Sequence, residues 1–212
     1  MAKHTFAMSD VTGDTRGLAR VSYGYDWNFL SDDETLLFGT TDETAFSVKN
    51  ITPGTGISTG TGTLFKGSVL RMGDVIETTI VMDLTGLNSG NADLDVIGVA
   101  DTANCHIGQI TAAANGTILG GYVQCLETPA GGEPDIDLHS NTVATLTEDA
   151  AHNASGTSAA LMTAAADWTG VLAPKSLTAV PAANTYLYLI ASGGATNATY
   201  TAGKFIIKLY GY

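Results

Sequence analysis

Strand-length segments with period-two alternation, separated by Gly, Asn and Pro turns, restrict the fold of this chain more than any other feature. In GDVIETTIVMDLTG, Ile76, Ile80 and Met82 fall on one face, while Glu77 and Asp83 fall on the other. This is the pattern of a half-buried β-strand. Short strands that recur with such turns predict a two-sheet sandwich or barrel.

The predicted fold class is an all-β, jelly-roll-like antiparallel β-sandwich with an extended N-terminal arm and at most one short helix. The sandwich domain covers residues 45–212, and residues 1–44 form an arm or a first strand region. Further strands are predicted within TAFSVKNI, LDVIGVAD, PDIDLHSN, TVATLTE and NTYLYLIAS. The helical candidate is TSAALMTAAADW, residues 157–168, because Ala, Leu and Met favour helix.

The segment YTAGKFIIKLYGY, residues 200–212, predicts a strand in the interior of a sheet. Phe205, Ile207 and Leu209 alternate with Lys204 and Lys208. An exposed edge with this apolar pattern would template association through its unpaired backbone groups. We therefore expect neighbouring strands on both sides of it.

Charge excludes several classes of partner. The formal net charge is −12, and the 212 residues contain only three arginines. Nucleic-acid binding requires a basic stripe that neutralises phosphates, and an anionic membrane surface is disfavoured for the same reason. The N-terminus lacks the apolar region of a signal peptide, and no apolar run approaches membrane-spanning length. We expect a protein made and kept soluble in a cytoplasm, unless lysis or another route exports it.

The N-terminal region contains a candidate interaction surface. Tyr23, Tyr25, Trp27 and Phe29 recur at period two. This pattern fits an aromatic interface on an extended arm, and it also fits an ordinary first strand of the sandwich.

No catalytic motif meets its structural requirement, so we predict no enzyme and no cofactor. GISTG, residues 56–60, matches the nucleophile-elbow pattern, but its flanks show neither the strand nor the helix which that motif requires. The four histidines are scattered, without zinc-ligand spacing. Motifs that cradle phosphate groups are absent.

Two carboxylate pairs are weak metal candidates. Asp93 with Asp95, and Asp135 with Asp137, have the spacing that places two acids on one face of a strand, where they could share Ca²⁺. Their alternation with apolar residues also fits the solvated face of a half-buried strand, which is the interpretation we favour.

The two cysteines flank a predicted hairpin. Asn115-Gly116 is typical of a type I′ turn between Cys105 and Cys125. Regular pairing across that turn would place the two thiols on opposite faces, whereas a one-residue bulge would make them neighbours. We expect two reduced, buried thiols, as is usual in a cytoplasm, with a disulfide as the alternative.

The closing hairpin resembles a known group of proteins. The segment TYLYLIASGGATNATYTAGKFIIKLYGY, residues 185–212, together with an acidic composition rich in Thr, Ala and Gly, resembles structural proteins of tailed-bacteriophage virions, most of all capsid cement or decoration proteins. The resemblance covers these residues and is compositional elsewhere. It implies a jelly-roll domain, often a homotrimer, that is made in the host cytoplasm, sits on the capsid exterior and bridges subunits of the major capsid protein.

Two other classes remain open. One is a head-fibre, tail or receptor-binding β-sandwich that binds carbohydrate, with Trp27, Tyr122 or Trp168 as sugar platforms. The other is a β-protein that cleaves glycosides or esters, which would show two converging carboxylates or a Ser-His-Asp geometry.

Overall fold

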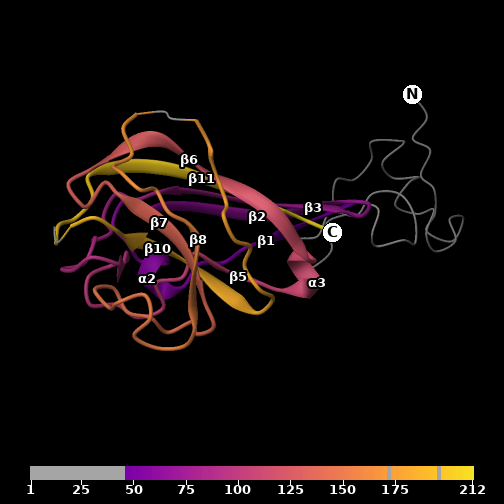
Figure 1. Ribbon diagram of the computed structural model, residues 1–212, viewed down its shortest axis with the longest axis horizontal. Coiled ribbons are helices and arrows are strands. Elements are labelled where there is room, and N and C mark those ends of the chain that lie inside the picture. Colours follow the sequence, from indigo (N-terminus) through magenta and orange to yellow (C-terminus); the bar gives the residue numbers. More distant parts are fainter. Residues whose placement is uncertain (1–45, 171–172, 195–196) are drawn as a thin grey trace, which may run out of the picture.

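A computed structural model describes residues 46–170, 173–194 and 197–212, with side chains from residue 49 onward. The predicted arm, residues 1–44, and its aromatic residues Tyr23, Tyr25, Trp27 and Phe29 lie outside the described residues. In the described part, two antiparallel sheets pack as a sandwich, which confirms the predicted fold class (Figure 1).

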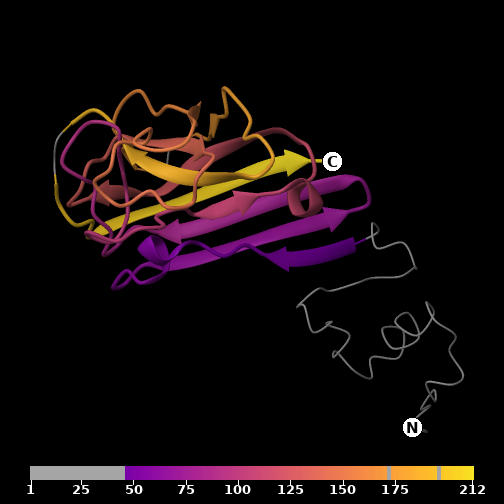
Figure 2. The ribbon, with the colours of Figure 1, turned by 90° about the horizontal axis from the view of Figure 1, so that it is seen from below.

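The first sheet has six strands in the order β1-β2-β3-β11-β6-β9. Figure 2 shows its long strands side by side. Their bounds are Phe46–Asn50 for β1, Leu64–Met72 for β2, Val75–Asp83 for β3, Ala202–Gly211 for β11, Ile118–Ala130 for β6 and Lys175–Ser176 for β9.

The second sheet has five strands, in which β10 is central. It pairs with β7 on one side and with β4 and β5 on the other, and β8 pairs with β7 at the edge. The bounds are Asp95–Val96 for β4, Gly108–Ile110 for β5, Ile136–Asn141 for β7, Ser158–Met162 for β8 and Thr185–Ala191 for β10.

The connections wrap around the sandwich in a jelly-roll-like way. The consecutive strands β10 and β11 lie in different sheets, and so do β3 and β4, and β6 and β7. In one sheet β11 lies between β3 and β6, and in the other β10 lies between β4 and β7. The ribbon β10–β11 is therefore flanked by the same two ribbons in both sheets.

The closing strand β11 is interior, as its pattern predicted. Phe205, Ile207 and Leu209 are buried, and Ile207 pairs with Ile80 of β3 and with Val123 of β6. These inward side chains meet Leu187 and Leu189 of β10 in the main core. Burial of one face at period two is what fixes the register here, because a one-residue slip would expose the whole set.

Two local predictions are wrong. Residues 157–168 form no helix: Ser158–Met162 is strand β8, which buries Leu161 and Met162 against β7. The Asn115-Gly116 segment is not a two-residue hairpin turn, because Ala112–Asn115 forms the one-turn helix α3. In both places tertiary contacts decide among the conformations that the local residues allow.

Other elements differ in detail from the predictions. Only Asp95–Val96 of LDVIGVAD is a strand, and TVATLTE, residues 142–148, contains no strand. The glycine-rich loop contains a second one-turn helix, α2, at Thr55–Ser58. Cys105 and Cys125 are free and buried, as expected, but they belong to separate hydrophobic clusters. No helix among the described residues is long and apolar enough to cross a membrane.

Candidate functional site

Strand β7 carries a line of buried polar side chains on the outer side of the five-stranded sheet. Its residues Ile136 and Leu138 face the main core, so the alternate residues Asp137, His139 and Asn141 face away from it. These outward side chains are nonetheless buried. The segment 142–157 covers this side of the sheet, and Asn141 donates from Nδ2 to two carbonyl groups within it.

The same segment buries a second hydrophobic cluster beside the polar line. Tyr188 of β10, which is opposite His139 in the β7 register, packs with Val96, Cys105 and Leu146. The Tyr188 hydroxyl donates to the Val143 carbonyl at 2.8 Å. We call this outer side of the five-stranded sheet the covered face.

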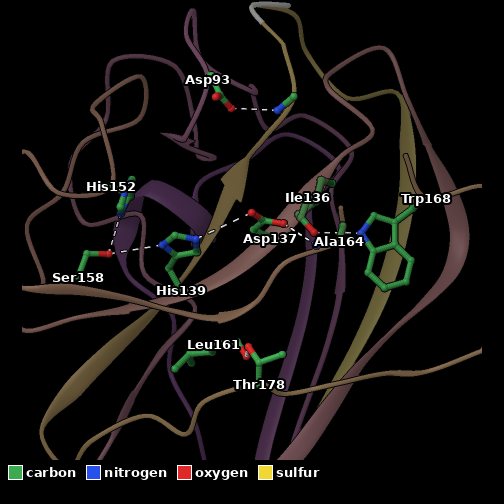
Figure 3. A network of polar contacts seen from close by, with 11 residues as sticks. Asp93, Ile136, Asp137, His139, His152, Ser158, Leu161, Ala164, Trp168 and Thr178 are labelled. Carbon is green, nitrogen blue, oxygen red and sulfur yellow. Dashed lines mark hydrogen bonds and ion pairs between the residues drawn. The ribbon is translucent and has the colours of Figure 1, made fainter. Parts of the chain in front are cut away.

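Four side chains of the covered face lie in a row (Figure 3). Asp137 Oδ2 is 4.0 Å from His139 Nε2. The other ring nitrogen of His139, Nδ1, is 3.5 Å from Ser158 Oγ, which is 2.8 Å from His152 Nδ1. The rings of His139 and His152 meet edge to face, with centroids 4.7 Å apart.

Burial sets the electrostatics of this row. Asp137 is fully buried, and desolvation raises the pKa of its carboxyl group. His139 is 4% exposed, and desolvation, together with the neighbouring His152, lowers its pKa to about 4. Both effects disfavour charge inside the row, because a charged group loses its hydration when it is buried.

The order Ser-His-Asp raises the question of nucleophilic catalysis. The separations of 3.5 Å and 4.0 Å exceed those of formed hydrogen bonds. A histidine with a pKa of about 4 is also a weak base at neutral pH, where a general base works best with a pKa near the ambient pH. The row therefore lacks both the hydrogen-bond geometry and the base strength of a Ser-His-Asp triad. Ser58 of GISTG ends the one-turn helix α2, with no strand directly before it.

The structure does not place the two predicted carboxylate pairs as their spacing in the sequence suggested. Leu94 has a positive φ of 67°, which breaks the alternation between Asp93 and Asp95. Asp93 is exposed and accepts a hydrogen bond from the Gly193 amide at 2.9 Å, whereas Asp95 is buried at the start of β4.

The expectation of a solvated face is wrong for Asp95, Asp135 and Asp137, which are all buried. For Asp137 the physical reason is that other segments cover the outer side of the five-stranded sheet, whereas Asp95 is opposite Ala191, a residue of the main core. Desolvation and the nearby Asp137 raise the pKa of Asp135 to about 6. Among the described residues, no three His, Cys, Asp or Glu side chains converge in a way that could hold a metal ion.

The outer side of the six-stranded sheet contrasts with the covered face, and we call it the open face. Val75 and Val81 of β3 and Tyr210 of β11 alternate with buried residues and are exposed there. Their neighbours include Leu64 and Met72 of β2, which pair with outward residues of β3. No segment within the described ranges packs over this side.

Ion pairs run across the open face between the apolar residues. Lys208 contacts Glu77 at 2.7 Å, and Lys204 contacts Asp83 at 3.4 Å and also Glu127. These pairs join β11 to both of its neighbours. They pair Lys204 and Lys208 within the sheet, whereas Lys66 of β2, opposite Val81, is exposed and has no ion pair among the described residues.

Of the proposed sugar platforms, Trp168 is fully buried: its ring packs against Phe205, and Nε1 donates to the Ile136 carbonyl at 3.0 Å. That part of the carbohydrate hypothesis is wrong. Tyr122 is partly exposed on the open face, 6.5 Å from Tyr210 between ring centroids.

The sequence analysis missed the row on the covered face. The period-two signal in PDIDLHSN was visible, but Ser158 fell within a predicted helix. Comparison with protein-family models, with curated proteins and with solved structures found no match to this chain.

Proposed function

We propose that this protein is a non-enzymatic structural protein of a tailed-phage virion that binds the outer capsid surface as a homotrimer. It cements or decorates the shell by bridging subunits of the major capsid protein. The virion assignment rests on the resemblance of residues 185–212 to cement and decoration proteins. The sandwich fold is compatible with it.

One structural observation carries the assembly role: exposed apolar side chains gather on one sheet. Of the nine large hydrophobic side chains that are exposed among the described residues, five lie on the open face: Leu64, Met72, Val75, Val81 and Tyr210. Two more, Leu119 and Leu126, lie on β6, and only Val180 is remote from this sheet and its ends. Exposed apolar side chains that gather on one face in this way favour an interaction site there.

We assign the open face to the capsid. Lys204 and Lys208 are ion-paired on the face itself, so among the lysines of the described face only Lys66, opposite Val81, would be desolvated without a partner on the sheet when a protein docks there. The trimer contact is then formed by other surfaces.

Co-sedimentation with undecorated capsids tests this assignment. Val81→Glu places a charge on the open face, and Val180→Glu is the matched control, because both valines are exposed and only Val81 lies on that face. The wild-type chain and Val180→Glu should pellet with capsids, while Val81→Glu should remain in the supernatant. All three should elute as trimers in size-exclusion chromatography with light scattering.

Two results would contradict the proposal. Failure of the wild-type chain to pellet with capsids removes the cement role. Loss of the trimer in Val81→Glu alone would assign the open face to contacts between copies instead of the capsid.

The second candidate function is a head-fibre, tail or receptor-binding protein that binds carbohydrate. The Tyr122–Tyr210 pair favours it, because aromatic rings beside polar groups suit sugar rings. Glycan-array binding by the wild-type chain that is lost in Tyr122→Ala, without binding to capsids, would support this alternative.

A further inference from the structure

The four-residue row of the covered face connects a buried acid to the surface. Asp137 is fully buried at one end, and His152 is half-buried at the other. Asp137 Oδ2 and His139 Nε2 face each other and have no hydrogen-bond partner among the described residues. We propose that Asp137, His139, Ser158 and His152 form a proton relay that loads the buried Asp137 carboxylate with a proton taken from solvent at His152.

Two arrangements of hydrogens satisfy the whole row. In the first, His152 Nδ1–H donates to Ser158 Oγ, the Ser158 hydroxyl donates to His139 Nδ1, and His139 Nε2–H donates to the Asp137 carboxylate. In the second, every bond is reversed: Asp137 Oδ2–H donates to His139 Nε2, His139 Nδ1–H donates to Ser158, and Ser158 donates to His152 Nδ1. Each side chain can serve in both roles.

The two arrangements differ by one proton. Conversion of the first into the second begins when His152 Nε2 takes a proton from water. His152 then passes its Nδ1 proton to Ser158, Ser158 passes its own to His139 Nδ1, and His139 passes its Nε2 proton to Asp137. One proton has entered, both imidazoles are neutral again, and the carboxylate has become a carboxylic acid.

The distances fit a relay that closes through small ring movements. The bond between Ser158 and His152 is formed at 2.8 Å, while the other two separations are 3.5 Å and 4.0 Å. Proton transfer requires hydrogen-bond contact, so the Ser158–His139 separation has to shorten by roughly 0.5 Å and the His139–Asp137 separation by about 1 Å; because the imidazole ring is rigid, Ser158 or Asp137 has to move together with His139.

The groups around the row determine which of its side chains holds the added proton. Burial raises the pKa of Asp137 and lowers that of His139, so the acid is the favoured end point. Lys175 of β9 favours the charged form of Asp137, whereas Asp93 opposes it. Asp135 also couples to Asp137 by charge repulsion.

The remaining titratable neighbour is Tyr188 of β10. It is opposite His139 in the strand register, and its hydroxyl is engaged by Val143. Outside the row, a side-chain hydrogen bond from Ser192 also favours the charged form of Asp137.

Protonation of Asp137 affects a hydrogen bond that its carboxyl group accepts from the backbone. Asp137 Oδ1 accepts from the Ala164 amide at 2.6 Å and so holds the segment that follows β8. A bond to a charged acceptor is stronger than a bond to a neutral one. Acidification should therefore loosen Ala164, while Trp168 of the same segment stays anchored to the Ile136 carbonyl.

Nitrogen NMR of the imidazole rings tests the relay in the full chain. On acidification from neutral pH to the pH at which the Asp137 carboxyl group is protonated, the ring proton of His139 should move from Nε2 to Nδ1, and that of His152 from Nδ1 to Nε2. Both changes should share one midpoint with the Asp137 carboxyl carbon shift. The protection of the Ala164 amide, taken relative to its intrinsic exchange rate at each pH, should fall with the same midpoint.

Ser158→Ala should uncouple the two rings, so that their tautomers no longer change together. Ser155→Ala is the matched control, since Ser155 is exposed in the same covering segment. An unchanged amide fingerprint spectrum confirms that both variants fold. The relay is excluded if either wild-type ring gains protons on both nitrogens over this range, if the midpoints differ, or if Ser158→Ala behaves as the wild-type chain.

Discussion

On the outer side of each sheet, outward side chains alternate with core residues. The two outer sides nevertheless differ in their exposure to solvent. On the six-stranded sheet, Val81 and Tyr210 stand exposed between ion-paired lysines. On the five-stranded sheet, Asp137 and Tyr188 occupy equivalent outward positions and are fully buried. The difference comes from the covering segment 142–157, which packs over the latter side only among the described residues.

This difference separates two roles. The covered face has a second hydrophobic cluster and buried polar groups, so substitutions there should change stability and titration. The open face has few buried contacts to lose, so substitutions there should change association while the fold remains intact.

Truncation of one tyrosine on each face should give the largest difference in the free energy of unfolding. Tyr188→Ala removes a ring buried in the second cluster, and we expect the free energy of unfolding to fall by about 3–5 kcal/mol. Tyr210→Ala on the open face should cost less than about 1 kcal/mol. Urea unfolding measures both, and equal losses would show that the open face is as tightly packed as the covered one.

Glycine replacement should give the next largest contrast. A Cβ at Gly98 would collide with the Cys105 sulfur beneath the covering loops, so Gly98→Ala should cost about 1–3 kcal/mol or more. A Cβ at Gly120 on β6 meets nothing within 4 Å, so Gly120→Ala should be close to neutral. Thermal unfolding of the two variants makes the comparison, and a large loss in Gly120→Ala would indicate unseen packing over β6.

The sequence could predict part of the difference between the two outer sides. It succeeded for strands that have one face in the core and the other in solvent. Strands β3 and β11 were predicted because buried and exposed residues alternate along them. The alternation of Asp135 and Asp137 with Ile136 was interpreted as a solvated face, but strand β7 is buried on both faces. The covering segment 142–157 follows β7 directly in sequence, but periodicity within the strand holds no information about how that segment folds back over the sheet.

The errors in local structure have similar causes. Residues 157–168 are rich in helix formers, but pairing of β8 with β7 buries Leu161 and overrides that propensity. At α3, the buried Asn115 side chain donates to Thr78 of β3 at 2.8 Å, a tertiary bond that a turn motif does not reveal. The convergence of Ser158, His139 and His152 likewise depends on tertiary contacts.

The Asp135 carboxyl group should make the free energy of unfolding depend on pH, with an effect of intermediate size. The pKa of Asp135 rises from 3.8 to about 6 in the folded chain. The folded state therefore binds its proton more tightly than the unfolded state, and this stabilisation is present below pH 3.8 and lost as the pH rises through 6. At about pH 7.5 the buried charge opposes folding.

Asp135→Asn removes that charge. We expect the variant to be more stable than the wild-type chain by on the order of 2 kcal/mol at about pH 7.5, with the difference disappearing near pH 4. Asp74→Asn is the control, because Asp74 is exposed at the β2–β3 turn, and it should show no such dependence. A gain that is the same at both pH values would rule out the titration of Asp135 as its cause.

The smallest expected effect lies on the open face, in the ion pair between Lys208 and Glu77. Their side chains are 24% and 26% exposed, so solvent should screen the pair. A double-mutant cycle with Lys208→Met and Glu77→Gln should give a coupling free energy of about 0.5 kcal/mol, falling further in about 1 M salt. A coupling several times larger that persists in salt would mean that the pair is desolvated in solution. The open face would then be covered in the isolated protein by other copies of the chain, and its assignment to the capsid would be wrong.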